Sequence, residues 1–544
     1  MFPASFRRLG FMVAAHLALL APVAAHAQEA ADAGSASVPP RGVAPVDAGA
    51  PPPTTNDVPP PALPPAGTPA APASATVAAT AAPAPEPPPL PPLPNHQSMG
   101  FLSRFLDGYT TDYAYVPRHP VPTRRSMPDA LDAPPFPASH WSLNGTPDIG
   151  VPDAAIYPLM GAIYGSGKVG EAIEDTRIKL YGWSDETLNA STSTSYRGNY
   201  PAAYQLNPNT LTLQQVLARL ERIPDTVQTD HVDWGFRVDA LYGVDYRYTE
   251  MNGIFANQLR NNNLYGYDLN EFYLDLYVPW VADGLDIRVG RYISIPDIEA
   301  NLTVDQPFSS HSLTYTYDPF SQMGIEFSLK IDKNWWAQLG LVAGDDVAVW
   351  GNNATPTLNG CIRWESTDQR DSWYPCINSL STQSYKPETA GPTPASSPLP
   401  FPSNNLNALS VTWGHRFTRE WTMQTESWFM WIPNAPEFEN GGPTGRLIPY
   451  NWEWTLLNFQ FYQFAPLDFL GWRNELFDDR FGQRTGFSGR IYETTVSWNH
   501  WFANKNIGIR PEIRVDQDLD GETPFDSGTK KSQVMGQLDL VTRF

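Results

Sequence analysis

The chain has 544 residues, a formal net charge of −21 at pH 7, 12% aromatic residues and only 17% charged residues. This length suits several globular domains or one large barrel with appendages. The acidic balance excludes nucleic acid as an expected partner, because a negative surface repels phosphate groups. Two cysteines are too few for a disulfide-rich scaffold or a four-cysteine zinc site.

The N-terminus has the pattern of a secretory signal peptide, which we assign to residues 1–27. Arg7 and Arg8 precede an apolar run at 9–24, and the Ala-His-Ala sequence at 25–27 has small residues at the expected cleavage site. The alternative is an uncleaved membrane anchor, but the apolar run is short for a spanning helix. We therefore expect an exported protein.

Two segments separate this signal peptide from the rest of the chain. Residues 28–95 are rich in alanine and proline, a composition that cannot build a core, so we predict a disordered linker of polyproline character. Residues 96–170 form an irregular segment ahead of the strand-rich region. Within it, only residues 99–106 have the pattern of a short amphipathic helix.

Residues 171–544 consist of stretches in which apolar and polar residues alternate. In the longest, residues 231–248, Trp234 and Val238 share one face, whereas Asp233 and Arg237 occupy the other. After residue 27, no stretch has the run of about 18 apolar residues that a transmembrane helix requires. A helical membrane protein is therefore excluded, which leaves a soluble β-sheet protein or a β-barrel.

The lengths of the connections distinguish these two classes. Short turns alternate with long loops, as in outer-membrane barrels with short periplasmic turns and long external loops. The turns lie near 281–284, 332–334, 418–420 and 503–506, and the loops near 294–320, 345–405, 433–451, 478–488 and 516–530. We therefore predict an all-β fold, an antiparallel transmembrane β-barrel over residues 171–544 with about fourteen strands, or roughly 12 to 16.

The two ends of this barrel constrain its strand order. A final strand that follows a long loop must run toward the periplasm, and counting back from it requires a descending strand at residues 210–222. The composition of that segment favours a helix, but closure of the barrel favours a strand. The terminal Phe544 resembles the signal by which the outer-membrane assembly machinery recognises barrels. We therefore expect that machinery and membrane lipid as partners.

Three segments of the predicted barrel resemble the putative β-barrel porin-2 (OmpL-like) family. They are residues 234–248, 284–292 and 524–530, the last reading Pro-Phe-Asp-Ser-Gly-Thr-Lys, and the resemblance runs from about Arg177 to Phe544. It implies a porin in the outer membrane of a Gram-negative bacterium. Such a protein lets small hydrophilic solutes and ions diffuse passively, without enzymatic activity or cofactor, and can form a homo-oligomer.

If the apolar faces of the strands meet lipid, their charged faces line a water-filled lumen. The alternative is that these charges pair across strands and only fill the barrel. Their mixed signs predict no ion preference. The expected pore-lining residues are Asp233, Arg237, Asp239, Asp245, Arg247, Asp275, Asp286, Arg288, Glu326, Arg473, Glu475, Arg510, Glu512, Arg514 and Asp539.

Two of the long loops carry further expectations. Cys361 and Cys376 lie in the loop at 345–405, and export leads to an oxidising compartment. We therefore predict a disulfide that braces this loop, with free thiols as the alternative. The loop at 294–320 can fold inward as a constriction, as the third loop of well-known porins does, but we favour a surface position.

Signals for metal binding and enzymatic activity are weak. Asp516, Asp518 and Asp520 match the first half of a calcium loop, but Ser527 stands where the motif requires glutamate, so we favour a solvated acidic turn. Two alternatives to a porin stay open. One is a structural barrel that is plugged by residues 96–170 and tethers the envelope. The other is an outer-membrane enzyme with a loop-borne site near His231 or His311.

Overall fold

The computed structural model describes residues 100–110, 122, 125, 149–152, 156–202, 204–256, 258, 261, 263–294, 298–351, 354–381, 384–385 and 406–544. All of them belong to one compact unit, Pro94–Phe544. The expected signal peptide and the linker at 28–95 lie outside the described residues.

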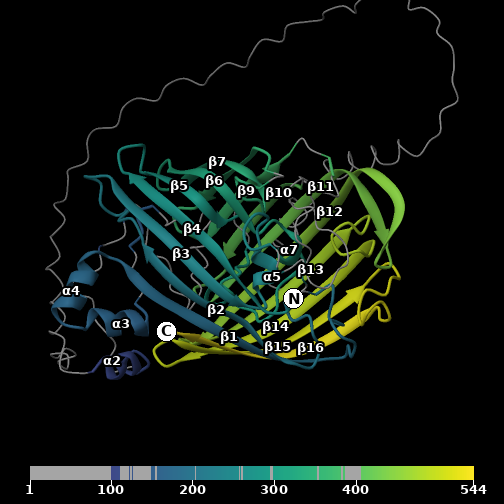
Figure 1. Ribbon diagram of the computed structural model, residues 1–544, viewed down its shortest axis with the longest axis horizontal. Helices are drawn as coiled ribbons and strands as arrows, with labels where there is room; N and C mark the ends of the chain where they lie inside the picture. The colour runs from purple at the N-terminus through teal and green to yellow at the C-terminus, as the bar shows by residue number, and fades with distance from the viewer. Residues whose placement is uncertain are drawn as a thin grey trace, which may run out of the picture. The chain divides into compact units, whose positions relative to one another are not determined.

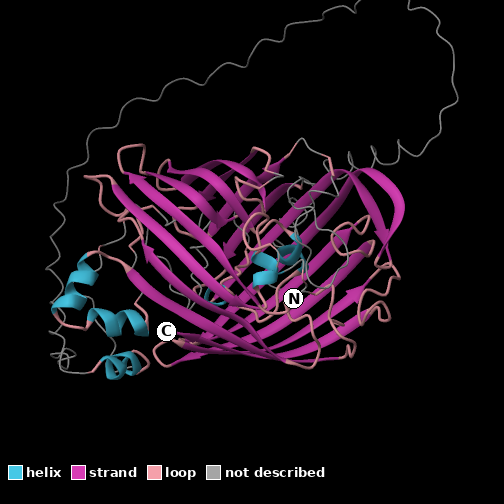
Figure 2. Cartoon of the chain, in the orientation of Figure 1, coloured by secondary structure: helices cyan, strands magenta, loops and turns pink. Residues whose placement is uncertain are grey.

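Within the described residues, sixteen strands form a closed antiparallel barrel (Figures 1 and 2). Each strand pairs with its sequence neighbours, and β1 pairs with β16 to close the ring. The strands are β1 (Lys179–Ser191), β2 (Leu211–Arg222), β3 (Asp233–Gly243), β4 (Gly266–Val278), β5 (Leu285–Ile293), β6 (Ser321–Lys330), β7 (Trp335–Asp345), β8 (Thr357–Glu365), β9 (Asp371–Leu380), β10 (Asn407–Arg416), β11 (Trp421–Glu439), β12 (Gly442–Ala465), β13 (Asp468–Asp479), β14 (Gly489–Phe502), β15 (Ile507–Asp518) and β16 (Ser532–Arg543).

The sequence predicted a barrel of this kind, but the strand count exceeds the preferred value of fourteen. The two extra strands, β8 and β9, lie in the segment at 345–405, where we expected one long loop, and they form a hairpin between β7 and β10. The prediction of a long loop at 433–451 is also wrong. Strands β11 and β12 extend through it and meet at a tight turn at residues 440–441.

The disputed segment at 210–222 is strand β2, which confirms the expectation based on barrel closure. It pairs with β1 on one side and with β3 on the other. Its inward face carries Gln215, Leu217 and Arg219, which are buried, whereas Leu220 faces outward and is exposed. Tertiary pairing has therefore overridden a local preference for helix, because each barrel strand needs two hydrogen-bonded neighbours.

Alternation between the two faces of the sheet holds around the ring. Leu274, Leu339 and Ile513 point outward and are 63%, 59% and 62% exposed, whereas the charged Glu271 and Arg514 point inward and are fully buried. Exposed apolar surface on this scale requires a partner, which for a closed barrel is lipid. Among the described residues, no helix is both long and apolar enough to cross a membrane.

Strand β3 is shorter than the sequence indicated. The alternation at 231–248 predicted one continuous strand, but β3 ends at Gly243, whose φ of +152° favours glycine. Asp245 and Arg247 therefore do not belong to the strand. Asp245 precedes the short helix α5 (Tyr246–Thr249) and Arg247 lies within it. Both side chains are nevertheless buried.

Helices of the segment that precedes the barrel lie beside its short-turn end, near the C-terminus of the chain (Figure 1). They are α2 (Phe101–Asp107), α3 (Pro158–Tyr164) and α4 (Lys168–Asp175). Tyr109 Oη donates to the carbonyl of Arg543 at 2.7 Å, and Asn506 Nδ2 donates to the carbonyl of Gly108 at 2.8 Å. We call the described residues of 100–176 the periplasmic cap, because short turns are expected to face the periplasm.

Candidate functional site

The inward faces of β1–β5 and β13–β16 form a surface rich in arginine and carboxylate groups, which we call the charged wall. On β2–β5 these groups are joined in pairs. Arg219 donates to Asp239 at 2.8 Å and to Glu271 at 3.1 Å. Arg288 forms a two-pronged contact with Asp275, at 2.8 and 2.9 Å. Further pairs join Arg237 to Glu221 and Arg291 to Asp268.

The other part of the charged wall follows the same rule. Arg473 lies 3.1 Å from Glu493, Arg510 donates to Asp539 at 2.8 Å, and Arg514 lies 2.8 Å from Asp516. All three arginines are fully buried. A buried charge is costly unless it is paired and hydrogen-bonded, and these partners meet that requirement.

Residues 298–320, which we call the inner loop, connect β5 to β6 and fold into the barrel. Nearly all of them are buried, including Phe308, Ser310 and Tyr317 at 0% exposure. The expectation of a surface position for this loop is therefore wrong. The loop contains two short helices, η3 (Thr303–Asp305) and α7 (Leu313–Tyr317).

Carboxylates of the charged wall hold the inner loop through its backbone N–H groups. Glu512 accepts from the backbone of Ser309 at 2.8 Å and of Ser310 at 3.2 Å. Glu475 accepts from the backbone of Leu313 at 2.7 Å and of Thr314 at 2.5 Å. Charge-assisted bonds of this kind are stronger than neutral ones, so they fix both the position and the orientation of the loop.

Arginines of the same wall donate hydrogen bonds to acceptor oxygens of the inner loop. Arg473 Nη1 donates to Glu299 of the loop at 2.9 Å and to the carbonyl of Ser310 at 2.7 Å. Arg510 donates to the carbonyl of Thr303 at 3.0 Å. Burial alone would raise the pKa of the Glu299 carboxyl, but Arg473 and His311 lower it below its ordinary value. Glu299 therefore stays ionised as the loop's anchor to β13.

The inward face of β6–β11 is different, and we call it the amide wall. Its members are mostly uncharged hydrogen-bonding side chains. These are Gln322, Ser328, Gln338, Asn359, Tyr374, Asn378, Ser410, Thr412 and Gln424. Lys330, Glu365 and Arg416 carry charge beside short turns, and Asp345 lies at the other end of β7. Arg363 of β8 is also buried on this wall and pairs with Glu365. In the middle of the wall the charged groups are Glu326 and Glu426.

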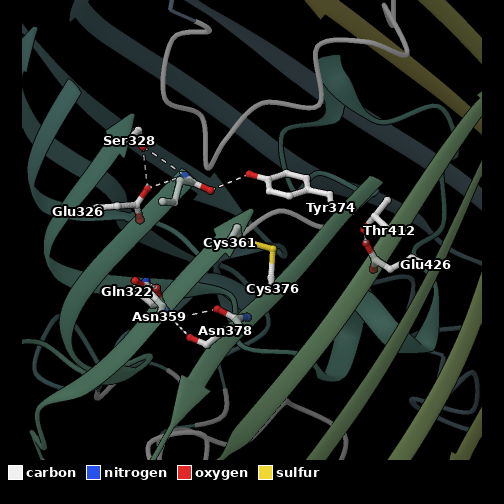
Figure 3. Close-up of a disulfide and its surroundings, with 11 residues drawn as sticks. Gln322, Glu326, Ser328, Asn359, Cys361, Tyr374, Cys376, Asn378, Thr412 and Glu426 are labelled. Atoms are coloured by element: carbon white, nitrogen blue, oxygen red, sulfur yellow. Dashed lines mark hydrogen bonds between the residues drawn. A yellow bond between two sulfur atoms is a disulfide. The ribbon is translucent and has the colours of Figure 1, made fainter. Parts of the chain in front are cut away.

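A disulfide joins Cys361 of β8 to Cys376 of β9 within the amide wall (Figure 3). The two cysteines are directly opposite each other in the strand register, with Cα atoms 4.2 Å apart. The bond thus cross-links two paired strands rather than bracing a loop. Beside it, Gln322 Nε2 donates to Asn378 Oδ1 at 3.0 Å and Tyr374 Oη donates to Gln338 at 2.7 Å.

The residues expected to line a pore fall into three groups. Those with a charged partner, or with a donor on the inner loop, are Asp233, Arg237, Asp239, Asp275, Arg288, Arg473, Glu475, Arg510, Glu512, Arg514 and Asp539. Asp286 and Glu326 also face inward. The Asp286 oxygens have no described hydrogen-bonding partner, and Glu326 accepts from Gln338 at 2.8 Å. Asp245 and Arg247 lie outside the strands.

Asp516, Asp518 and Asp520, the weak calcium candidate, do not come together as a single site. Asp516 faces inward and pairs with Arg514, whereas Asp520 pairs with Arg490 at 2.6 Å. Asp518 accepts from the backbone of Gly521 at 2.6 Å. These carboxylates thus have separate partners, and the described residues contain no group of acidic, histidine or cysteine side chains that could hold a metal ion.

Sequence reasoning missed several functional groups at this site. Asp185, Arg219 and Glu271 belong to the same pattern of alternating charge and were within its reach. The backbone N–H groups of Ser309, Ser310 and the residues that follow carry no sequence signal. The inner loop is rich in serine and threonine, as surface loops are, so its composition wrongly favoured a position on the surface.

The Pro-Phe-Asp-Ser-Gly-Thr-Lys segment at 524–530 belongs to the long loop between β15 and β16. It lies at the long-loop end of the barrel, where β1 pairs with β16. Asp526 accepts from the backbone of Thr194 at 2.8 Å and of Ser195 at 2.7 Å, and Lys530 lies 2.9 Å from Asp526. Hydrogen bonds from Ser195 and Lys530 hold the pKa of the Asp526 carboxyl well below its ordinary value. This segment therefore fastens the β15–β16 loop to the β1–β2 loop.

The periplasmic cap contacts the lumen from the other end. Tyr157 stacks on Tyr181 of β1, with ring centroids 4.3 Å apart. Met160 of α3 is fully buried in one apolar cluster with Trp183 and with Leu302 and Val304 of the inner loop. The cap and the inner loop therefore belong to one apolar cluster that also includes side chains of β1 and β2.

Comparisons with known proteins found several solved structures that are similar to this chain and one matching family. No curated protein matches the chain. Among solved structures it is similar to Salmonella typhi OmpF in complex with daunomycin (12% identity, 68% of this chain, 99% of that chain, TM-score 0.45). It is also similar to Pseudomonas putida OprB at high pH (11%, 70%, 97%, 0.43) and to the outer membrane channel DcaP of Acinetobacter baumannii (9%, 68%, 97%, 0.41).

The family assignment rests on a different comparison. The model of the family described as putative beta-barrel porin-2, OmpL-like, matches residues 177–544, which includes every strand of the barrel. The match agrees with the outward apolar faces, the inward polar faces and the closed ring. The chain belongs to this family and is an outer-membrane porin of a Gram-negative bacterium.

Proposed function

We propose that the protein is a passive channel through which small hydrophilic solutes cross the outer membrane beside the inner loop. The observation that carries this proposal is the fixed inner loop. It is bound to one side of a polar lumen by buried carboxylates and arginines, including Glu475, Glu512 and Arg473. Such a loop narrows the lumen without needing to move during passage.

Filtering in this channel is steric and electrostatic. The inner loop limits the size of a passing solute, and the fixed charges and dipoles of the walls act on its charge. Most arginines and carboxylates of the charged wall are already paired, so their net effect on ions is smaller than their number implies. Asp286 faces inward, and neither of its carboxylate oxygens has a described hydrogen-bonding partner.

A plugged structural barrel is the second candidate, because the periplasmic cap touches the inner loop through Met160, Leu302 and Val304. An enzymatic role has less support. The His311 ring lies 3.9 Å from the ring of Tyr204 and 4.9 Å from that of Tyr315, and its Nδ1 atom faces Glu299 at 3.6 Å. His231 is exposed at a turn beside Asp230.

Conductance in planar lipid bilayers tests the proposal. The full-length protein and the variant Met160→Asp, which places a charge in the contact between cap and inner loop, are compared with Val169→Asp on the exposed side of α4. Stepwise ohmic currents from the full-length protein support the channel, and larger steps from Met160→Asp alone identify the cap as a partial block. If neither protein conducts, although electrophoresis shows a folded barrel, the channel is contradicted and the plugged barrel is favoured.

A further inference from the structure

The amide wall differs from the charged wall in what it offers a passing molecule. Most of the described hydrogen bonds between the inner loop and the barrel wall run to β1, β2 and β13–β16. The contact with the amide wall is the backbone N–H of Ile298, which donates to Glu426 of β11 at 3.1 Å. The loop thus leans on the charged side of the lumen. The face of β7–β10 lies across from it.

Uncharged polar atoms without partners occur on both walls, for example at Gln214 and Gln537 of the charged wall, and on the amide wall they recur across four consecutive strands. Those on the amide wall are Asn359 Oδ1 on β8, Asn378 Nδ2 on β9, Ser410 Oγ on β10 and Gln424 Oε1 on β11. All four residues are more than nine-tenths buried. A buried polar atom without a partner costs free energy, so in a wet lumen such atoms bind water or a solute group.

The chemistry of these atoms matches hydroxyl groups. Asn359, Ser410 and Gln424 contribute acceptor oxygens and Asn378 contributes an N–H donor, and a sugar hydroxyl can both donate and accept. Tyr374, on β9 of the disulfide-linked pair of strands, adds an aromatic ring to the same surface (Figure 3). Aromatic rings offer apolar faces that pack on the C–H faces of sugars.

Charge on the amide wall disfavours ionic solutes. In its middle, Glu326 is bound by Gln338, and Glu426 accepts from Thr412 at 2.9 Å. Both carboxylates repel anions, and the cation of Arg363, 6.0 Å from the Tyr374 ring centroid, is paired with Glu365. The two carboxylates are also satisfied by the neighbouring side chains, which lowers the gain from binding a cation. An uncharged solute pays neither the repulsion nor the loss of its ionic hydration.

We infer that the amide wall is a binding surface for uncharged polyhydroxylated solutes, of which monosaccharides and short oligosaccharides are the simplest examples. This inference rests on the proposed channel function and names its preferred solute class. Solute hydroxyls replace water at Asn359, Asn378, Ser410 and Gln424 during passage, and the weak binding holds the solute along this side of the lumen.

Two measurements on the full-length protein test the solute class. Liposome swelling compares a neutral hexose with the hexosamine and the hexuronate of similar size, and we expect the neutral sugar to enter several-fold faster than either. In a bilayer, neutral oligosaccharides at millimolar concentration should interrupt the ion current transiently. Equal entry rates, or faster entry of the hexosamine, overturn the inference while leaving the channel intact. Absence of any current contradicts the channel itself.

A pair of variants locates the binding surface. Asn359→Leu combined with Asn378→Leu preserves side-chain size and removes two hydrogen-bonding groups, so sugar block should weaken about tenfold with little change in open-channel current. The control is Gln214→Leu on β2, another buried amide without described partners, on the charged wall. An equal loss in the control overturns the assignment to the amide wall. If the double variant does not fold, the single Gln424→Leu variant decides the same question.

Discussion

The charged wall and the amide wall are built from different strands of one barrel, and they solve different problems. On the charged wall, ions such as Arg473, Arg510 and Glu512 are bound to the inner loop or to each other. On the amide wall, short polar side chains keep hydrogen-bonding atoms unpaired, and two cysteines lock a pair of strands together. One wall fixes an internal loop in place, whereas the other presents chemistry to what passes.

This difference shows why a count of inward charges is a poor guide to selectivity. A buried ion pair is nearly neutral from a distance, so a wall crowded with paired charges exerts less force on ions than a few unpaired ones. The residues with the strongest sequence signal, the alternating charges of β3 and β15, serve mainly to hold the barrel interior. The less conspicuous amides carry the recognition.

The largest expected effect follows from Arg473→Met, which leaves Glu299 and Glu493 without their shared cation. Breaking a buried ion pair costs about 3–5 kcal/mol in the free energy of unfolding. Urea titration of the protein in detergent, followed by tryptophan fluorescence, measures this loss. The control is Arg490→Met, which breaks the solvent-exposed pair with Asp520 and should cost far less than Arg473→Met. Similar losses in both variants would remove the distinction between fixed and solvated charges.

Removing the disulfide tests whether the two walls are independent. Cys361→Ala combined with Cys376→Ala should lower the free energy of unfolding by about 2–3 kcal/mol, because the cross-link restricts the unfolded chain. Hydrogen exchange of the inner loop should not change, since the disulfide lies on the other wall. Faster exchange at residues 309–317 would show that the walls are coupled.

Glu475→Gln weakens the support of α7 while keeping the side chain's shape. Only one oxygen remains to accept from Leu313 and Thr314, so local opening of the inner loop should become easier by about 1–3 kcal/mol. Amide hydrogen exchange at these two residues reports this change directly. Glu326→Gln on the amide wall is the matched control, and unchanged protection in Glu475→Gln would contradict the anchoring role.

The smallest effect concerns pH. Burial, opposed by Gln215 and reinforced by Asp185, raises the pKa of Asp245 to about 8. The folded state therefore holds this proton more tightly than the unfolded chain, whose aspartate titrates near 3.9. The contribution of Asp245 to stability is complete below pH of about 4 and is lost as pH rises through about 8.

Hydrogen exchange at residues 244–252, corrected for intrinsic rates, measures this local effect between pH 5 and pH 9. Protection should fall as pH rises in the parent protein and stay constant in Asp245→Asn. A parent protein whose protection rises with pH would contradict the sign of the shift, and hence the burial of an uncharged Asp245 beside the charged wall.

The sequence predicted the barrel because its physical cause is local and repetitive. Alternation at Asp233, Arg237 and Asp239 reflects one lipid face and one inner face, and parity required β2 despite its helical composition. Strands β8 and β9 were missed because their apolar residues are few: Leu358, Ile362 and Trp364 on β8 are separated by asparagine, glycine and arginine.

The inner loop and the amide wall could not be predicted for a different reason. The loop is fixed by backbone N–H groups of Ser309 and Leu313 that meet Glu512 and Glu475 from strands distant in sequence. The sequence does not show whether an asparagine or glutamine on a barrel strand has hydrogen-bonding partners. Only the three-dimensional arrangement shows that Asn378 Nδ2 has no partner.

The periplasmic cap has a consequence for the order in which the protein matures. Its contacts involve both ends of the ring: Tyr157 stacks on Tyr181 of the first strand, and Tyr109 donates to the carbonyl of Arg543 on the last. This docking surface includes both the first and the last strand, so it exists only after β1 and β16 have paired. The cap can therefore bind only to a closed barrel. The time at which the cap becomes resistant to protease in pulse-labelled cells would show when the barrel closes.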